Sequence, residues 1–224
     1  MSDTMLHLGN IGMDIIRRIQ LELKNNPQVW NQYDFRRKDP SSPHHGLDDI
    51  WVRYQHLDDV NPDIPCNLMM QKFPHESVWY PSIKYLPSIK DLAYEIMGKV
   101  KGERLGGILI TRIKPGKQCR PHVDVGTWHA AYYNCKIAVQ LECAPDINYH
   151  AGLVDTPEQA FHFPGEHFCA KQGDYYWFDN QKEHWVPNNS KVDRITIIIC
   201  IRTDREDMFS KFLKEDVCLG QQRR

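Results

Sequence analysis

The feature that most constrains this chain is a series of short apolar runs separated by turn residues, which begins near Leu105. The runs cover residues 107–113, 135–141, 161–163, 175–178 and 194–201, and the turn signals Pro115-Gly116 and Gln172-Gly173-Asp174 fall between them. Runs of this length, rich in β-branched and aromatic residues, are typical of strands in a sandwich or barrel. The sequence therefore predicts a mostly β structure from residue 105 to residue 203.

The residues before this region show two helical patterns. Ile11, Ile15, Ile16, Ile19 and Leu23 recur at helical spacing before Asn25-Asn26-Pro27, which cannot continue a helix. A second helix is predicted over 89–100, with Ser88 as its N-cap. Residues 30–84 show little periodicity except for a strand at 50–54, and we expect this segment to wrap around the β region. The tail after residue 204 predicts a short helix with an apolar side.

These patterns predict one domain over 1–224. It would consist of N-terminal helices and a wrapping segment (1–104), a β core (105–203) and a C-terminal tail (204–224). A chain of this length buries roughly three quarters of its unfolded surface, which is enough for a stable core.

Composition excludes several classes of function. The chain has 28 Lys and Arg against 29 Asp and Glu, so its net charge of −1 gives no strong signal for binding nucleic acid or anionic lipid. No apolar run reaches the roughly 18 residues that a membrane span needs, and the N-terminus lacks signal-peptide order, so we expect a cytoplasmic protein. The seven Cys are scattered without a CxxC pair, and Cys119 and Cys135 are expected to be buried apolar residues.

A His and an Asp two positions apart follow the strand at 107–113 and its Pro-Gly turn. In extended chain, residues i and i+2 point to the same side, so His122 and Asp124 could hold one ion together. The pattern is weak by itself, since an exposed loop His is the ordinary explanation. The other His residues, including His44, show no ligand spacing.

Two further residues strengthen this interpretation. His184 follows a strand and a turn, and can therefore lie at one end of a barrel. Arg194 opens the last strand, where alternation places it on one face with Thr196, Ile198 and Cys200. An inward-facing Arg is costly unless an anion pairs with it. Two His and one carboxylate form the facial triad typical of non-haem Fe(II), and Arg194 would bind the far carboxylate of a bound diacid.

Residues 105–203 resemble the 2-oxoglutarate- and Fe(II)-dependent oxygenases of the aspartyl/asparaginyl β-hydroxylase-like family, which also includes free-proline hydroxylases. The resemblance rests on the motifs KPG, PHxD, NCK, GD, FD, H, NxS and R, in this order. The resemblance implies a double-stranded β-helix (jelly-roll, cupin-like) with supporting helices. It implies that Fe(II), 2-oxoglutarate and dioxygen are used to hydroxylate an unactivated C–H bond, with release of succinate and CO₂. His122, Asp124 and His184 would ligate the metal, and Arg194 would bind 2-oxoglutarate.

The sequence also departs from the family pattern. Relatives often carry Arg-x-His where this chain has Ala138-Val139-Gln140, so Gln140 or the nearby Lys136 is expected to contact the co-substrate instead. A solvated lysine at the strand edge is an equal reading of Lys136. Thr111 matches a position where some relatives place a hydroxyl near the distal carboxylate, although an ordinary strand Thr is an equal reading. Classical aspartyl/asparaginyl hydroxylases lack a ligand at the position of Asp124, so the chain looks more like the free-amino-acid hydroxylases.

The substrate is the least determined feature. Trp128 and His129 could form a pocket wall, and Arg53 or Arg120 could contact an acidic substrate group, against the alternatives of structural packing and surface salt bridges. We expect an amino acid or similar small polar molecule, with a protein or peptide side chain second and a nucleobase third. A non-catalytic metal-binding barrel and a cupin-type enzyme without a co-substrate acid stay open as alternatives, and so does the oligomeric state.

Overall fold

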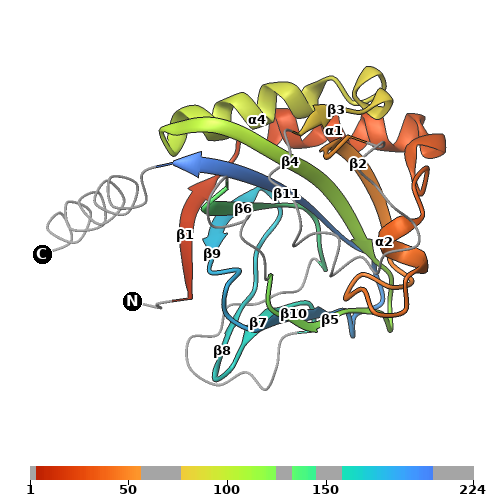
Figure 1. Ribbon diagram of the computed structural model, residues 1–224, viewed down its shortest axis with the longest axis vertical. Helices are drawn as coiled ribbons and strands as arrows, with labels where there is room; N and C mark the ends of the chain where they lie inside the picture. The colour runs from red at the N-terminus through yellow and green to blue at the C-terminus, as the bar shows by residue number, and fades with distance from the viewer. Residues whose placement is uncertain (1–3, 57–76, 125–132, 145–157, 204–224) are drawn as a thin grey trace, which may run out of the picture.

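A computed structural model gives the structure of the protein, and it describes residues 4–56, 77–124, 133–144 and 158–203. Two antiparallel sheets face each other (Figure 1). The larger one has seven strands in the order β1-β9-β6-β11-β4-β2-β3, and the smaller one has four in the order β5-β10-β7-β8. This arrangement confirms the predicted mostly β, double-stranded β-helix fold.

The larger sheet is built from both halves of the chain. Its strands are β1 (Met5–Asn10), β2 (Asp48–Tyr54), β3 (Val78–Trp79), β4 (Gly102–Ile113), β6 (Cys135–Glu142), β9 (Asp174–Phe178) and β11 (Arg194–Thr203). Three of these strands come from the first hundred residues, which therefore contribute to the sheet as well as wrapping it. Strand β11 lies between β6 and β4, where it pairs along its length with both.

The smaller sheet consists of short strands that the apolar runs predicted only in part. It contains β5 (Gln118–His122), β7 (Phe161–Phe163), β8 (Glu166–Phe168) and β10 (His184–Pro187). Of these, only β7 was predicted. The others are only three to five residues long, which is too short for a reliable alternation of apolar and polar residues.

Helices α1 (Met13–Asn25) and α4 (Ser88–Lys99) cover the outer face of the larger sheet (Figure 1). They bury Ile16 and Ile19 of α1 and Leu92 and Ile96 of α4 against the sheet. The outward side chains of β11, from Ile195 to Ile201, belong to this same core. The remaining short helical turns are η1 (Pro27–Val29), α2 (Phe35–Lys38) and η3 (Pro81–Lys84).

One predicted detail of α4 was wrong. Ser88 is the first residue of the helix, and Pro87 occupies the N-cap position without a side-chain cap. The Ser88 hydroxyl instead donates a hydrogen bond to Glu22 Oε1 of α1 at 2.6 Å, because α1 lies directly beside this end of α4. Ser88 therefore joins the two helices. The helix predicted after residue 204 lies outside the described residues.

Within the described residues, no helix is both long and apolar enough to cross a membrane.

Candidate active site

A cavity of about 360 Å³ lies between the inward faces of the two sheets. Strands β4 and β11 of the larger sheet and β5 and β10 of the smaller one contribute to its lining. The segment 41–44 and Arg36 of α2 complete one wall. The N-terminal segment therefore helps to form the cavity, which the sequence did not predict.

The three residues predicted as metal ligands converge at this cavity. His122 of β5 and His184 of β10 are directly opposite each other in an antiparallel pair, and their ring centroids are 4.2 Å apart. Asp124 follows β5, and its backbone N–H donates to the carbonyl of Asn180 at 2.9 Å. Its Oδ1 lies 3.6 Å from Nε2 of His122, and its Oδ2 lies 4.0 Å from Nε2 of His184. The three side chains thus present one donor atom each to a common point.

The backbone orients both imidazoles toward that point. Nδ1 of His122 lies 2.7 Å from the carbonyl of Arg120, and Nδ1 of His184 lies 2.9 Å from the carbonyl of Lys182. Because a carbonyl only accepts, each Nδ1 carries the proton and leaves the Nε2 lone pair free to ligate. Burial lowers the pKa of His122, and it lowers the pKa of His184 to about 4. Both rings are therefore neutral near pH 7, as metal ligation requires.

Arg194 points into the same cavity, as alternation along β11 predicted. It is buried, with 4% of its surface exposed. Its guanidinium donates to the hydroxyl of Thr196 at 2.6 Å and to that of Tyr176 at 3.2 Å. Among the described residues, no carboxylate forms an ion pair with it. A buried cation of this kind is suited to an anionic ligand with which it can pair.

Two neighbours of Arg194 were predicted to contact the co-substrate. Thr111 lines the cavity on β4, directly across from Thr196. Gln140 pairs with Thr196 from the other side, and its Oε1 accepts a hydrogen bond from the Thr196 hydroxyl at 3.2 Å. Its amide nitrogen donates to the carbonyl of Ile195 at 3.0 Å. Gln140 is thus placed behind Thr196, where it orients the group that holds Arg194.

Lys136 lies on β6 and lines the cavity. Its ammonium group is hydrogen-bonded to Oδ2 of Asp124. Lys136 therefore contacts the carboxylate of the candidate metal centre.

The predicted substrate residues are not brought together. Arg53 donates to the carbonyl of Gly106 at 3.2 Å, and its guanidinium lies 5.6 Å from the centre of the Trp79 ring. Arg120 donates to the carbonyls of Pro40 and Ser42. Neither side chain belongs to the described lining of the cavity. Trp128 and His129 lie outside the described residues.

The sequence reasoning missed three polar residues of this cavity and its surroundings. Tyr176 contacts Arg194, and no sequence signal marked it, because β9 is aromatic at four consecutive positions and is buried on both faces. Arg36 is buried and lies 3.8 Å from Asp49. His44 lies beside His122, with ring centroids 5.7 Å apart. Arg36 and His44 come from a segment without periodicity, so no sequence signal marked them.

A double-stranded β-helix with two His and one Asp at its cavity defines the class of the 2-oxoglutarate- and Fe(II)-dependent oxygenases. Within that class, the chain belongs to the family described as aspartyl/asparaginyl beta-hydroxylase, whose sequence profile matches residues 17–203. The assignment predicted from the sequence motifs is confirmed. No curated protein matches the chain in sequence.

Solved structures of similar fold were also found. A prolyl hydroxylase from Trichoplax adhaerens, in complex with a hypoxia inducible factor oxygen degradation domain peptide fragment, has a TM-score of 0.52 and 14% identity over 89% of this chain and 84% of its own. A Pseudomonas putida prolyl-4-hydroxylase has a TM-score of 0.47 and 14% identity, covering 90% and 92% of the two chains. A 2OG-Fe(II) oxygenase family protein from Burkholderia pseudomallei has a TM-score of 0.45 and 12% identity, covering 70% and 68%. The first of these supports the fold.

Proposed function

We propose that this protein is a hydroxylase that uses Fe(II), 2-oxoglutarate and dioxygen to convert an unactivated C–H bond of an amino acid or similar small polar substrate into an alcohol. The balanced reaction takes substrate, 2-oxoglutarate and dioxygen to hydroxylated substrate, succinate and carbon dioxide. Bound Fe(II) supplies the activation of dioxygen.

The donor set fits that metal. His122, Asp124 and His184 offer two neutral imidazoles and one carboxylate from one side of the cavity, which is the facial arrangement that non-haem Fe(II) prefers. The carbonyls of Arg120 and Lys182 hold the imidazoles in the required tautomer. We assign Lys136 the role of holding Oδ2 of Asp124, so that the carboxylate keeps one orientation.

The observation that carries the proposal is the buried guanidinium of Arg194 in the cavity that also holds this donor set. A 2-oxo diacid bound at the metal would extend its far carboxylate to Arg194, where the fork of N–H groups pairs with it. Thr111 and Thr196 offer hydroxyls beside this position. A metal site with a purely structural purpose would have no use for an inward guanidinium.

The deciding experiment is succinate formation by the iron-loaded protein with 2-oxoglutarate, first alone and then with a panel of amino acids, peptides and nucleosides. We expect slow uncoupled turnover, and stimulation by one class of the panel. Asp124→Ala and His184→Ala should abolish both activities. Near-native turnover in either variant would contradict the assignment, and absence of any turnover in the wild type would favour a non-catalytic metal-binding barrel.

A peptide side chain is the second candidate substrate. The Trichoplax adhaerens neighbour was solved with a peptide fragment, and it shares the fold with this chain. Stimulation by peptides but not by free amino acids would decide for this alternative.

A further inference from the structure

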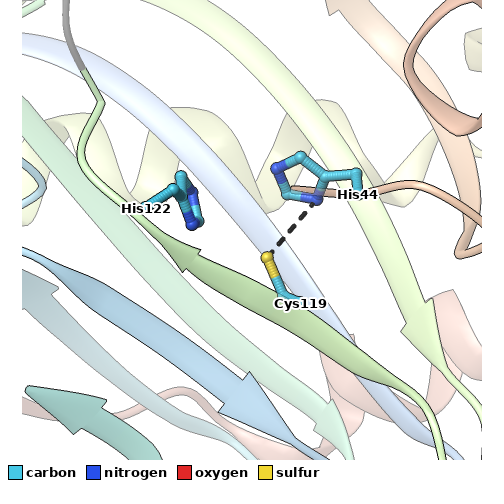
Figure 2. A group of neighbouring side chains, drawn as sticks. All are labelled: His44, Cys119 and His122. Carbon is cyan, nitrogen blue, oxygen red and sulfur yellow. Dashed lines mark hydrogen bonds between the residues drawn. The ribbon is translucent and has the colours of Figure 1, made fainter. Parts of the chain in front are cut away.

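A second group of possible metal ligands lies beside the first and shares one member with it. His44, Cys119 and His122 each offer one ligand atom, and these atoms all lie within 4.8 Å of one another. Figure 2 shows the three side chains turned toward a common region, with Cys119 on the strand and His44 on the facing loop. Sγ of Cys119 lies 3.7 Å from Nδ1 of His44.

These separations suit a tetrahedral zinc ion. Zn–N bonds of about 2.0 Å and Zn–S bonds of about 2.3 Å at tetrahedral angles place two nitrogen donors about 3.3 Å apart and a nitrogen and a sulfur donor about 3.5 Å apart. The Cys119 to His44 separation is already close to the second value. Small rotations of the side chains would bring all three donors to one ion.

The backbone directs Cys119 and His122 to the same side. In the β5–β10 pair, His184 lies opposite His122 and Val186 lies opposite Cys119. The two positions are three residues apart on β5 but only two residues apart on β10. This bulge absorbs one residue and re-aims the side chain that follows it. As a result, Cys119 and His122 both line the cavity although they are three positions apart.

Arg120, one of the two residues between Cys119 and His122, holds the loop that carries His44. Its backbone N–H donates to the carbonyl of Pro43 at 3.0 Å. Its guanidinium donates to the carbonyl of Pro40 at 2.6 Å and also to that of Ser42. Three bonds from one residue therefore fix the segment just before His44.

We propose that His44, Cys119 and His122 form a binding site for a thiophilic divalent ion of the Zn²⁺ type, and that this site competes with the iron site for His122. On binding, the ion forms a bond to Sγ of Cys119 and displaces the thiol proton to solvent. A thiolate and two imidazoles select zinc, which also binds N and S ligands more tightly than Fe²⁺ does. The competition with iron for His122 rests on the proposed function. The zinc site itself does not depend on that function.

Cobalt is the probe that separates the two sites. Co²⁺ bound to a thiolate shows a sulfur-to-metal charge-transfer band in the near ultraviolet, whereas the His122, Asp124 and His184 group contains only N and O donors. We expect the band in the metal-free wild type and in Asp124→Ala, and its loss in Cys119→Ser. Cys200→Ser is the matched control, because Cys200 is another buried thiol that lines the same cavity, and it should keep the band.

Absence of the band in the wild type, or its persistence in Cys119→Ser, would overturn the site. His44→Gln provides an independent measurement if Cys119→Ser does not fold. It should keep the band but weaken Co²⁺ affinity at least tenfold, and unchanged affinity would also overturn the site.

The competition is tested by Zn²⁺ inhibition of uncoupled succinate formation. The Zn²⁺ concentration for half inhibition should be at least tenfold higher in His44→Gln than in the wild type. Equal inhibition of both would mean that zinc acts at the iron site alone, and the competition would be refuted. The cobalt band is independent of turnover, so failure of the hydroxylase proposal would leave that test intact.

Discussion

Replacing Arg194 tests the co-substrate pocket most directly, because this side chain is buried and its described contacts are few. Two of its five N–H groups donate to Thr196 and Tyr176, and no other acceptor for the guanidinium is found among the residues that the structure describes. Arg194→Met removes the charge and the fork together. The Thr196 hydroxyl keeps its bond to Gln140, so that side of the pocket stays in place.

The expected size of the effect follows from burial. Removing one partner of a buried, hydrogen-bonded charge pair costs about 3–5 kcal/mol. At about 1.4 kcal/mol per tenfold change, Arg194→Met should raise the 2-oxoglutarate concentration for half-maximal turnover by a factor of roughly 10² to 4 × 10³. Arg194→Lys retains the charge but not the bidentate geometry, and it should give a smaller increase.

The assay is succinate formation by iron-loaded protein over a range of 2-oxoglutarate concentrations, with iron binding checked separately. Arg202→Met is the matched control, since Arg202 is a half-exposed residue of the same strand that pairs with Glu103 at 3.5 Å. We expect the control to behave as the wild type does. An unchanged 2-oxoglutarate requirement in Arg194→Met would refute the role of this guanidinium.

Three further predictions concern stability, each measured by urea unfolding of metal-free protein. Burial lowers the pKa of His184 to about 4, so on acidification from about pH 6.5 to 4 the unfolded chain binds this proton first. The contribution of His184 to stability should fall by up to about 1.4 kcal/mol per pH unit, so total stability should fall less steeply in His184→Gln. Equal slopes would disprove this. Asn188 is fully buried and donates to the carbonyls of Ile113 and Val192 at 2.7 and 2.8 Å. Asn188→Ala should therefore lower the free energy of unfolding by about 2–4 kcal/mol. Asn189 is exposed, so Asn189→Ala should change it little. A Cβ at Gly106 would lie 2.5 Å from the ring of Tyr133, so Gly106→Ala should lower the free energy of unfolding by about 1–3 kcal/mol. A Cβ at Gly98 in α4 would meet nothing within 4 Å, so Gly98→Ala should be stabilising. Equal effects of the two substitutions would contradict the packing argument.

Much of the fold could be read from local patterns. Strand β11 was recognisable because β-branched residues alternate with the residues that face the cavity, and α1 was recognisable from its helical spacing. Strands β5 and β10 were not recognisable, although they carry both histidine ligands, because strands of four or five residues are too short to show a reliable hydrophobic period. The role of Ser88 was also predicted wrongly, because its hydrogen-bond partner Glu22 is distant in the sequence.

The amino-acid sequence by itself determined the class of chemistry. The ligand types of His122 and Asp124 are properties of the residues themselves, and the inward direction of Arg194 follows from the alternation of its near neighbours along the strand. Only the tertiary structure decided which groups meet them. It placed Lys136 against Asp124, turned Arg120 toward the loop before His44, and brought His44 to Cys119 across 75 residues. Those contacts depend on a strand bulge and on the packing of segments far apart in the chain, and neither has a local signature.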